Sequence, residues 1–467
     1  MEGEKAAPEN SVHEYRDLCA GERDFVDQRK KKVLESFRKR NADCAEDSVP
    51  HIALLGSGGG QRAAVGLLGS LSQMEKDDLL DSVLYLGGVS GSTWSMAFLY
   101  TDPEWSMKVD EVIENLMKPE VNVLEAVSWL NERYHEEDFS FSDIWGLFIA
   151  TVIMKQMELG KLSDPVNRNP NNPYPIYCAT EDNCRKNGPI EGKWFEVTPH
   201  EAGFTELGLF VETRLLGSKF QNGELMEEKR EMDMVKLQGI LGAAFADTEV
   251  VREYFSDDWK TALEVFFATV ETLTTFLSPK KFEWKWGTTN NFCYEYKDSN
   301  GPLRNLTSLE NINLVDAGLL MNIPFPSFLG DKRDIDLIIA LEFTEGDTFQ
   351  TLNLARDYAT KLGKPFPVTD KDKLGEEALP LGHYVFEGTE KEPTVVYLPL
   401  FNQDNCETRE EYNDRMDKFT TVQVPYTKEQ TDELLEIAKG NIWKNKGVLL
   451  EQINKAAVRR RERRQNE

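Results

Sequence analysis

The sequence predicts an α/β fold with a mostly parallel central sheet and helices on its faces. Two short apolar runs, residues 52–55 and 83–86, are bounded by glycine or charge, as buried parallel strands are. Between them, residues 62–76 carry apolar side chains at helical spacing. Each run leads into a glycine-rich turn, and both turns fall at the same edge of the sheet. That edge is where α/β folds hold their functional groups.

The first turn, GSGGG at residues 56–60, precedes the predicted helix directly. Glycines at a helix N-terminus leave N–H donors and a positive dipole end, which suit an oxyanion or a phosphate. A P-loop requires a lysine after its glycines, and none follows here. A dinucleotide fingerprint requires an acidic residue after the next strand, but this strand ends in Gly87 and Gly88. The turn therefore favours oxyanion binding.

The second turn, GVSGS, places Ser90 between glycines on a strand-to-helix connection. This is the pattern of a nucleophile elbow, whose neighbours are small because the turn is tight. The usual pattern ends in glycine, and Ser92 stands there instead. The motif alone also fits an ordinary tight turn. The glycine turn one strand-helix unit earlier can direct its N–H groups toward Ser90, which makes Ser90 the candidate nucleophile.

A strand predicted at residues 312–315 carries Asp316 at its carboxyl end, where a second catalytic group is expected. A capping box of Thr427 and Gln430 predicts the start of a C-terminal helix. The other elements are predicted from periodicity: helices at 15–40 and within 105–160, strands at 176–179, 335–343 and 395–401, and an amphipathic helix at 258–277 that is either a lid or part of the core.

Several motifs together resemble the patatin-like catalytic domain of the group IV cytosolic phospholipase A2 family. They occur in family order: GSGGGQRA, GVSGSTW, WFE with TPH, GSKF, WGTTN, NLVDAGLLMNIPFP and PLFN. The likeness covers nearly the whole chain and is nearest to the gamma-type form, which lacks a C2 domain. It implies a central mostly parallel sheet flanked by helices, with a helical lid or cap insertion.

The resemblance also implies a catalytic dyad without histidine. It assigns Ser90 as the nucleophile, Asp316 as the general base, and Gly59 and Gly60 as oxyanion donors. A carboxylate has an ordinary pKa near 4. It can accept a serine proton if the site is dry and if the oxyanion is strongly stabilised, so that proton transfer accompanies attack.

Two arginines match family positions. Arg62, just after the glycines, is expected to bind the substrate phosphate, because its planar fork suits a phosphodiester. Arg333 is expected near the site in a supporting role. For both, the alternative is a surface ion pair.

The implied activity is that of a calcium-independent phospholipase A2 or lysophospholipase. It would cleave fatty acyl esters of glycerophospholipids through an acyl-serine intermediate, and a lysophospholipid acceptor would make the same enzyme a transacylase. Two alternatives remain. One is a Ser-His-Asp esterase or lipase, since Ser90, Asp316 and His383 fall in the chain order of that class. The other is a catalytically silent lipid-binding protein.

Composition narrows the partners. A formal net charge of −27 argues against nucleic acid. The longest apolar run, residues 144–154, is about half the length of a bilayer crossing. The polar N-terminus excludes a signal peptide, so we expect a cytoplasmic protein with peripheral contact to intracellular membranes. The H-E-x-x-H zinc pattern is incomplete after His135 and after His200, and we expect no metal or cofactor.

We expect three segments along the chain. Residues 1–48 form a helical N-terminal extension that is too short for a C2 domain, so calcium-driven membrane docking is not expected. Residues 49–455 form a single catalytic α/β domain with insertions. Residues 456–467 form a basic tail, which is either a solvated helix end or a weak, salt-sensitive tether to anionic membranes.

Overall fold

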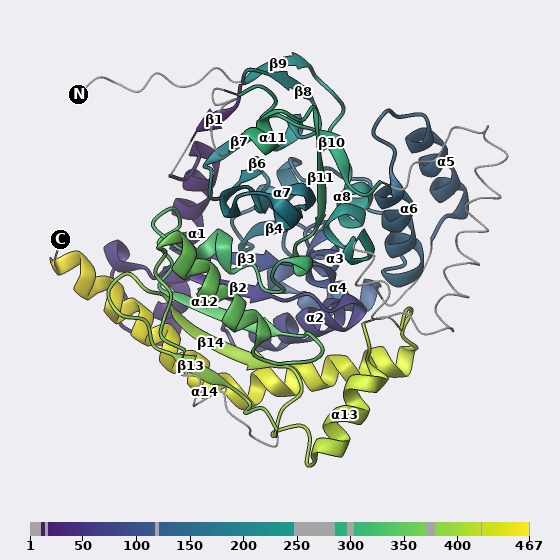
Figure 1. The fold of residues 1–467 in the computed structure, drawn as a ribbon. Coiled ribbons are helices and arrows are strands. Elements are labelled where there is room, and N and C mark those ends of the chain that lie inside the picture. Colours follow the sequence, from purple (N-terminus) through teal and green to yellow (C-terminus); the bar gives the residue numbers. More distant parts are fainter. Residues whose placement is uncertain are drawn as a thin grey trace. The chain divides into compact units, whose positions relative to one another are not determined.

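The fold is described from a computed structural model (Figure 1). The described residues are 11–14, 17–116, 121–246, 285–296, 303–369, 379–421 and 423–466. The candidate lid helix at 258–277 lies outside them. The chain divides into two compact units. Unit 1 comprises Met1–Tyr15, Glu120–Ser163 and Ala179–Leu320, and unit 2 comprises Arg16–Pro119, Asp164–Cys178 and Met321–Glu467.

Unit 2 contains the predicted parallel sheet. Its strands are β2 (Ile52–Gly56), β3 (Tyr85–Gly88), the first part of β4 (Tyr174–Glu181), β12 (Leu337–Glu342), β13 (Tyr384–Phe386) and β14 (Thr394–Pro399). They lie in the order β4-β3-β2-β12-β14-β13, and only the last pairing is antiparallel among these strands. The last residue of β3, Gly88, lies opposite Tyr177 of β4. The predicted strands at 52–55, 335–343 and 395–401 are confirmed to within a few residues.

Helices connect and cover these strands. They are α1 (Ala20–Lys39), α2 (Gly60–Lys76), α3 (Gly91–Leu99), α4 (Val109–Leu116), α12 (Gln350–Leu362), α13 (Arg409–Lys418) and α14 (Lys428–Asn466). Helix α2 joins β2 to β3, as predicted. It is buried along most of its length because it packs against α14 on one side and α3 on another.

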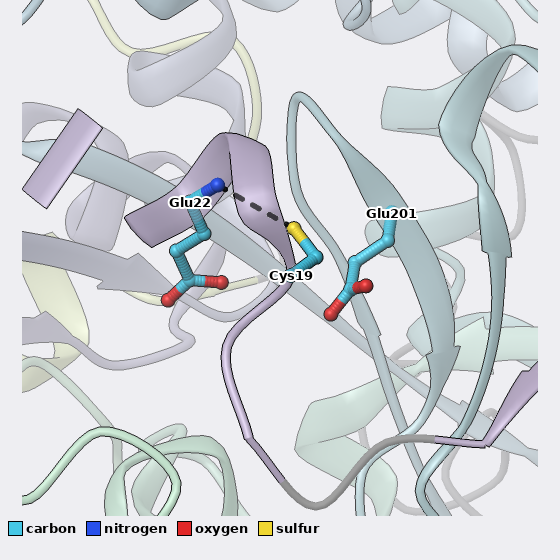
Figure 2. Close-up of side chains that lie close together, drawn as sticks. All are labelled: Cys19, Glu22 and Glu201. Atoms are coloured by element: carbon cyan, nitrogen blue, oxygen red, sulfur yellow. Dashed lines mark hydrogen bonds between the residues drawn. The ribbon is translucent and has the colours of Figure 1, made fainter. Parts of the chain in front are cut away.

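Helix α1 is an integral part of unit 2 and not a separate extension. Its first N–H groups are capped by Cys19, whose sulfur accepts a hydrogen bond from the Glu22 N–H at 3.4 Å (Figure 2). Arg29 is fully buried and donates to the carbonyl oxygens of Val83 (3.1 Å) and Leu80 (3.2 Å). Burial lowers the pKa of Arg29 to about 10. The expected boundary at residue 48 therefore cuts through packed structure.

The basic C-terminal segment is likewise the end of a packed helix. The predicted capping box is confirmed, because Gln430 N–H donates to Thr427 Oγ1 and Thr427 N–H donates to Gln430 Oε1. From there α14 runs beside β14 (yellow and green in Figure 1). Near its end, Arg460 is 4% exposed and donates to the carboxylates of Asp336 (2.6 Å) and Asp334 (2.8 Å).

Arg463 donates to the same two aspartates. These arginines pair with carboxylates of their own chain, and the segment from residue 456, expected as a separate basic tail, forms the last part of α14. Arg460 in particular is not exposed to a lipid surface.

Unit 1 combines antiparallel strands with short helices. Its strands are β1 (His13–Glu14), β5 (Trp194–Val197), β6 (Glu201–Phe204), β7 (Leu209–Glu212), β8 (Lys219–Gln221), β9 (Glu224–Glu227), β10 (Thr288–Asn290), β11 (Asn311–Asp316) and the last part of β4. Its helices are α5 (Val123–Tyr134), α6 (Phe141–Phe148), α7 (Asp182–Asn187), α8 (Met234–Leu241) and α11 (Arg304–Thr307).

Strand β11 exists where the sequence predicts it, but it pairs antiparallel with β4, with Asp316 opposite Ala179. The parallel-sheet interpretation did not anticipate this direction, because a short apolar run does not specify its partner strand. In the part of the chain that the structure describes, no helix is both long enough and apolar enough to cross a bilayer.

We predict that the stability of unit 2 depends on the close contact between α2 and α14. A β-carbon at Gly69 would lie 2.7 Å from the Leu435 carbonyl oxygen and 2.8 Å from Ala438 Cβ. Gly69→Ala should therefore lower the free energy of unfolding by about 1–3 kcal/mol, as overpacking does. The matched control is Gly440→Ala on α14, where a β-carbon meets nothing within 4 Å. This control should stabilise the protein by about 0.5–1 kcal/mol. Urea denaturation of both variants is the measurement, and equal midpoints would contradict the prediction.

Candidate active site

Ser90 lies on a strained turn in unit 2. Strand β3 ends at Gly88 and helix α3 begins at Gly91, so Ser90 stands between them. Its backbone has φ 52° and ψ −123°, a region that residues other than glycine rarely adopt. The residue is 7% exposed. This is the backbone geometry of a nucleophile elbow, which holds the serine hydroxyl clear of the main chain.

The glycine loop, residues 56–60, packs directly against this elbow. A β-carbon at Gly91 would lie 1.9 Å from the Gly60 carbonyl oxygen, so only glycine fits there. A β-carbon at Gly58 would lie 3.2 Å from Ser90 Cβ. The two glycine-rich turns that the sequence placed at one sheet edge are therefore in contact, and Ser90 of the second turn lies against the first.

Ser92, which departs from the usual glycine of the motif, ties the elbow to the glycine loop. Its hydroxyl donates to the Ser57 carbonyl oxygen at 2.6 Å. The Ser57 hydroxyl in turn accepts from the Phe343 N–H at 2.7 Å. The departure from the motif thus supplies a hydrogen bond that fixes the loop.

Gly59 and Gly60 carry the donors expected for an oxyanion. Both have positive φ, 139° and 58°, and Gly60 is the first residue of α2. Neither of these two N–H groups donates a backbone hydrogen bond to another described residue. The first N–H groups of a helix have no partner within the helix and lie at the positive end of its dipole. They are therefore suited to stabilise negative charge developing near Ser90.

Arg62 is buried inside unit 2 and bound by the protein itself. Its Nε donates to the Phe343 carbonyl oxygen (2.6 Å) and its Nη1 to Glu345 Oε1 (2.7 Å) and the Phe419 carbonyl oxygen (2.6 Å). Its Nη2 donates to Thr421 Oγ1 (3.2 Å). The residue is 0% exposed. The expected contact with a substrate phosphate would require these bonds to break.

Asp316, in unit 1, ends strand β11 and begins a short 3-10 turn, Ala317–Leu319. One carboxylate oxygen accepts the Gly318 N–H at 2.7 Å, which fixes the side chain at the start of that turn. The residue is 1% exposed. A buried carboxylate held by a backbone donor is a suitable positioned base.

Arg333 supports packing inside unit 2. Its guanidinium makes a two-point ion pair with the Glu22 carboxylate (2.8 and 3.0 Å) and donates to the Ser327 carbonyl oxygen (2.8 Å). Both side chains are buried, so the alternative of a surface ion pair is wrong for Arg333. A supporting role in catalysis stays a prediction.

His383 is far from Ser90 within unit 2. It precedes β13 at the sheet edge, and β2, β12 and β14 lie between β13 and the strand that carries Ser90. Four strand spacings amount to roughly 19 Å. The His383 Nδ1 instead hydrogen-bonds Asn445 Oδ1 of α14 at 2.7 Å. The structure therefore does not bring His383 to Ser90, contrary to the Ser-His-Asp alternative.

Three large hollows have described linings that include neither Ser90 nor Asp316. One of about 490 Å³ in unit 2 is lined from α1 by Lys31, Lys32 and Lys39 and faces several acidic side chains. Another of about 430 Å³ in unit 1 is lined from α5 and α8. A third hollow of about 450 Å³ in unit 2 is lined from α1 and by Arg464 of α14.

Sequence reasoning missed the residues that hold the glycine loop from outside. These are Phe343, Glu345 and the segment 419–421, together with Asn322, whose carbonyl oxygen accepts the Gly58 N–H at 2.8 Å. Asn322 belongs to the NIPFP motif, so it had a sequence signal. The others had none, because nothing local marks an ion pair between positions 283 residues apart.

Comparisons with known proteins agree with this geometry. The model of the lysophospholipase catalytic domain matches residues 52–360. Human cytosolic phospholipase A2 gamma is 30% identical over 93% of this chain and 94% of its own length. The solved structure of human GIVD cytosolic phospholipase A2 shares the fold, with a TM-score of 0.78 and 24% identity, over 97% of this chain and 69% of that one.

The same human protein in complex with methyl gamma-linolenyl fluorophosphonate matches with a TM-score of 0.74 and 26% identity, over 97% of this chain and 66% of that one. The family match spans the elbow, the glycine loop and Asp316. The predicted fold class is confirmed. The chain belongs to the cytosolic phospholipase A2 family of enzymes and carries its lysophospholipase catalytic domain.

Proposed function

We propose that this enzyme hydrolyses fatty acyl esters of glycerophospholipids and lysophospholipids through Ser90. The observation that carries the proposal is the strained Ser90 elbow, which packs against the glycine loop. The Gly59 and Gly60 N–H groups of that loop donate no backbone hydrogen bond to another described residue. That arrangement supplies a nucleophile and an oxyanion site together. Family membership directs the chemistry toward acyl esters of phospholipids.

In the proposed mechanism, Ser90 Oγ attacks the ester carbonyl carbon and its proton passes to the Asp316 carboxylate. The Gly59 and Gly60 N–H groups stabilise the oxyanion. The ester C–O bond then breaks, and the leaving alcohol takes the proton from Asp316. Water attacks the acyl-serine in the same way, which releases the fatty acid and restores Ser90. If a lysophospholipid hydroxyl attacks in place of water, the product is a new ester and the enzyme acts as a transacylase.

The mechanism uses only protein groups for nucleophile, base and oxyanion stabilisation, so its chemistry is calcium-independent. We place the enzyme in the cytoplasm, where it reaches its substrates by peripheral contact with intracellular membranes. A catalytically silent lipid-binding protein would not need the strained backbone of Ser90, which costs on the order of 1–3 kcal/mol.

Removal of either dyad member should abolish turnover. Ser90→Ala removes the nucleophile, and Asp316→Asn removes the base while keeping its shape. We expect losses of at least about a thousandfold in kcat, similar for both variants because the two groups act as one unit. Initial rates on a dispersed phospholipid are the measurement, with circular dichroism to verify folding. His383→Ala is the control and should keep wild-type rates; its loss of activity in a folded protein would favour the triad instead.

Labelling by a fluorophosphonate should identify the nucleophile directly. A long-chain alkyl fluorophosphonate should phosphonylate Ser90, release fluoride and stop turnover, because the oxyanion donors favour the tetrahedral adduct. Mass spectrometry of the digested protein locates the adduct. An adduct on another residue that coincides with complete inactivation would contradict the assignment.

Chelation should leave the chemical step unchanged. In detergent micelles, where docking to a bilayer is bypassed, excess EDTA should change kcat less than twofold, since no step of the mechanism uses a cation. Assays with added Ca²⁺ and with EDTA, run on the same phospholipid, are the measurement. A strict calcium requirement under these conditions would refute calcium-independent chemistry.

Product analysis tests the substrate class. The substrate is a phospholipid with different acyl chains at its two positions, offered with and without a lysophospholipid acceptor. Release of either fatty acid supports the proposed function, and transfer of the chain to the acceptor supports transacylation. If neither fatty acid is released while a simple aryl ester is cleaved, the phospholipid substrate class is wrong.

A further inference from the structure

The glycine loop is clamped from outside by residues that the mechanism does not yet use. Arg62, two residues after Gly60, spans two parts of unit 2 that are distant in sequence. Its guanidinium binds the Phe343 carbonyl and Glu345 on the segment after β12. It also binds the Phe419 carbonyl and Thr421 on the connection between α13 and α14.

The same groups touch the loop glycines. A β-carbon at Gly59 would lie 2.7 Å from the Phe343 carbonyl oxygen and 3.2 Å from Arg62 Nη2. A β-carbon at Gly60 would lie 2.9 Å from the Thr421 carbonyl oxygen. Two of the residues that hold Arg62, Phe343 and Thr421, therefore form the wall against which the two glycines pack.

Glu345 joins the two sides of this wall. Its Oε1 accepts both from Arg62 Nη1 and from the Thr421 N–H. Gln61 adds a parallel connection, because its Oε1 accepts the Tyr426 N–H at 2.7 Å. The first two long side chains of α2 thus both bind the connection between α13 and α14.

We infer that Glu345 is a positioning residue that acts through Arg62 and Thr421 to hold Gly59 and Gly60 in place. In this role Arg62 braces the oxyanion loop and does not bind the phosphate of the substrate. A guanidinium that is 0% exposed, with a carboxylate and two backbone carbonyls as partners, has its charge already balanced. The inference rests on the proposed function, since it explains how the donors of that mechanism are aligned.

The inference predicts equal damage on substrates with and without a phosphate. Arg62→Lys keeps the charge but cannot span four acceptors. Glu345→Gln keeps the shape but weakens both hydrogen bonds it receives. Misplacement of oxyanion donors by a fraction of an ångström costs about tenfold to hundredfold in rate. Each variant should therefore lower kcat by a similar factor on a phospholipid and on 4-nitrophenyl butyrate, with KM nearly unchanged on both.

Three further variants make the test specific. Glu345→Asp retains the carboxylate and should recover part of the lost kcat. Thr421→Val removes the 3.2 Å bond to Arg62 Nη2 and should give a smaller loss of the same kind. The matched control is Glu411→Gln, which breaks a partly exposed 2.9 Å ion pair with Arg415 on α13 and should leave both activities unchanged.

Selective loss decides against the inference. If Arg62→Lys impairs phospholipid hydrolysis and spares the aryl ester, Arg62 binds the phosphate. If Glu345→Gln lowers KM for the phospholipid, Glu345 competes with that phosphate for Arg62. Either result overturns a positioning role, and so does an absence of any effect in folded Glu345→Gln.

Failure of the proposed function would look different. Wild-type protein would then release no fatty acid from phospholipid, or Ser90→Ala would stay active. The effect of Glu345→Gln on the rate of Ser90 labelling by the fluorophosphonate would still report whether the loop is held. If circular dichroism shows that Arg62→Lys does not fold, the rates of the Glu345 variants alone decide the test.

Discussion

The contact between Gly91 and the Gly60 carbonyl oxygen constrains the rest of the site. Because there is no room for a β-carbon at Gly91, the backbone of the Ser90 turn lies directly against the backbone at the start of α2. Ser90 must then adopt a positive φ to leave β3 and enter α3. Hydrogen bonds from Ser92 and to Ser57 secure that arrangement against the strain it carries.

This constraint also explains why α2 is so thoroughly buried. The start of α2 has no side-chain cap, since its N-cap residue is Gly59. Its position must come from packing and from the side chains of its first turn. The close contact of Gly69 with Leu435 provides the packing. The side chains of Gln61 and Arg62 provide the hydrogen bonds of the first turn.

Local sequence patterns predicted the centre of the candidate site. They could not predict strand pairings or ion pairs between residues that are far apart in the sequence. Ser90 and the glycine loop are short motifs that residue type and spacing are enough to single out. Strand β11 was found by its apolar run, but its antiparallel direction depends on β4, which lies more than a hundred residues earlier. The Arg333 partner Glu22 is 311 residues away, and the basic C-terminal residues are paired with two aspartates that precede β12. Charge patterns gave no sign of either pairing.

The residues from 419 to 466 hold β12 at both of its ends. Arg460 pairs with Asp336 before the strand begins, while Phe419 and Thr421 meet Arg62 beside Phe343, where the strand has ended. During synthesis the elbow and its loop leave the ribosome more than three hundred residues before these braces exist. A nascent or prematurely terminated chain therefore carries Ser90 and its glycine loop without the Phe419 and Thr421 contacts to Arg62. In the proposed mechanism, competence to cleave an ester then arises only once these two residues have been made.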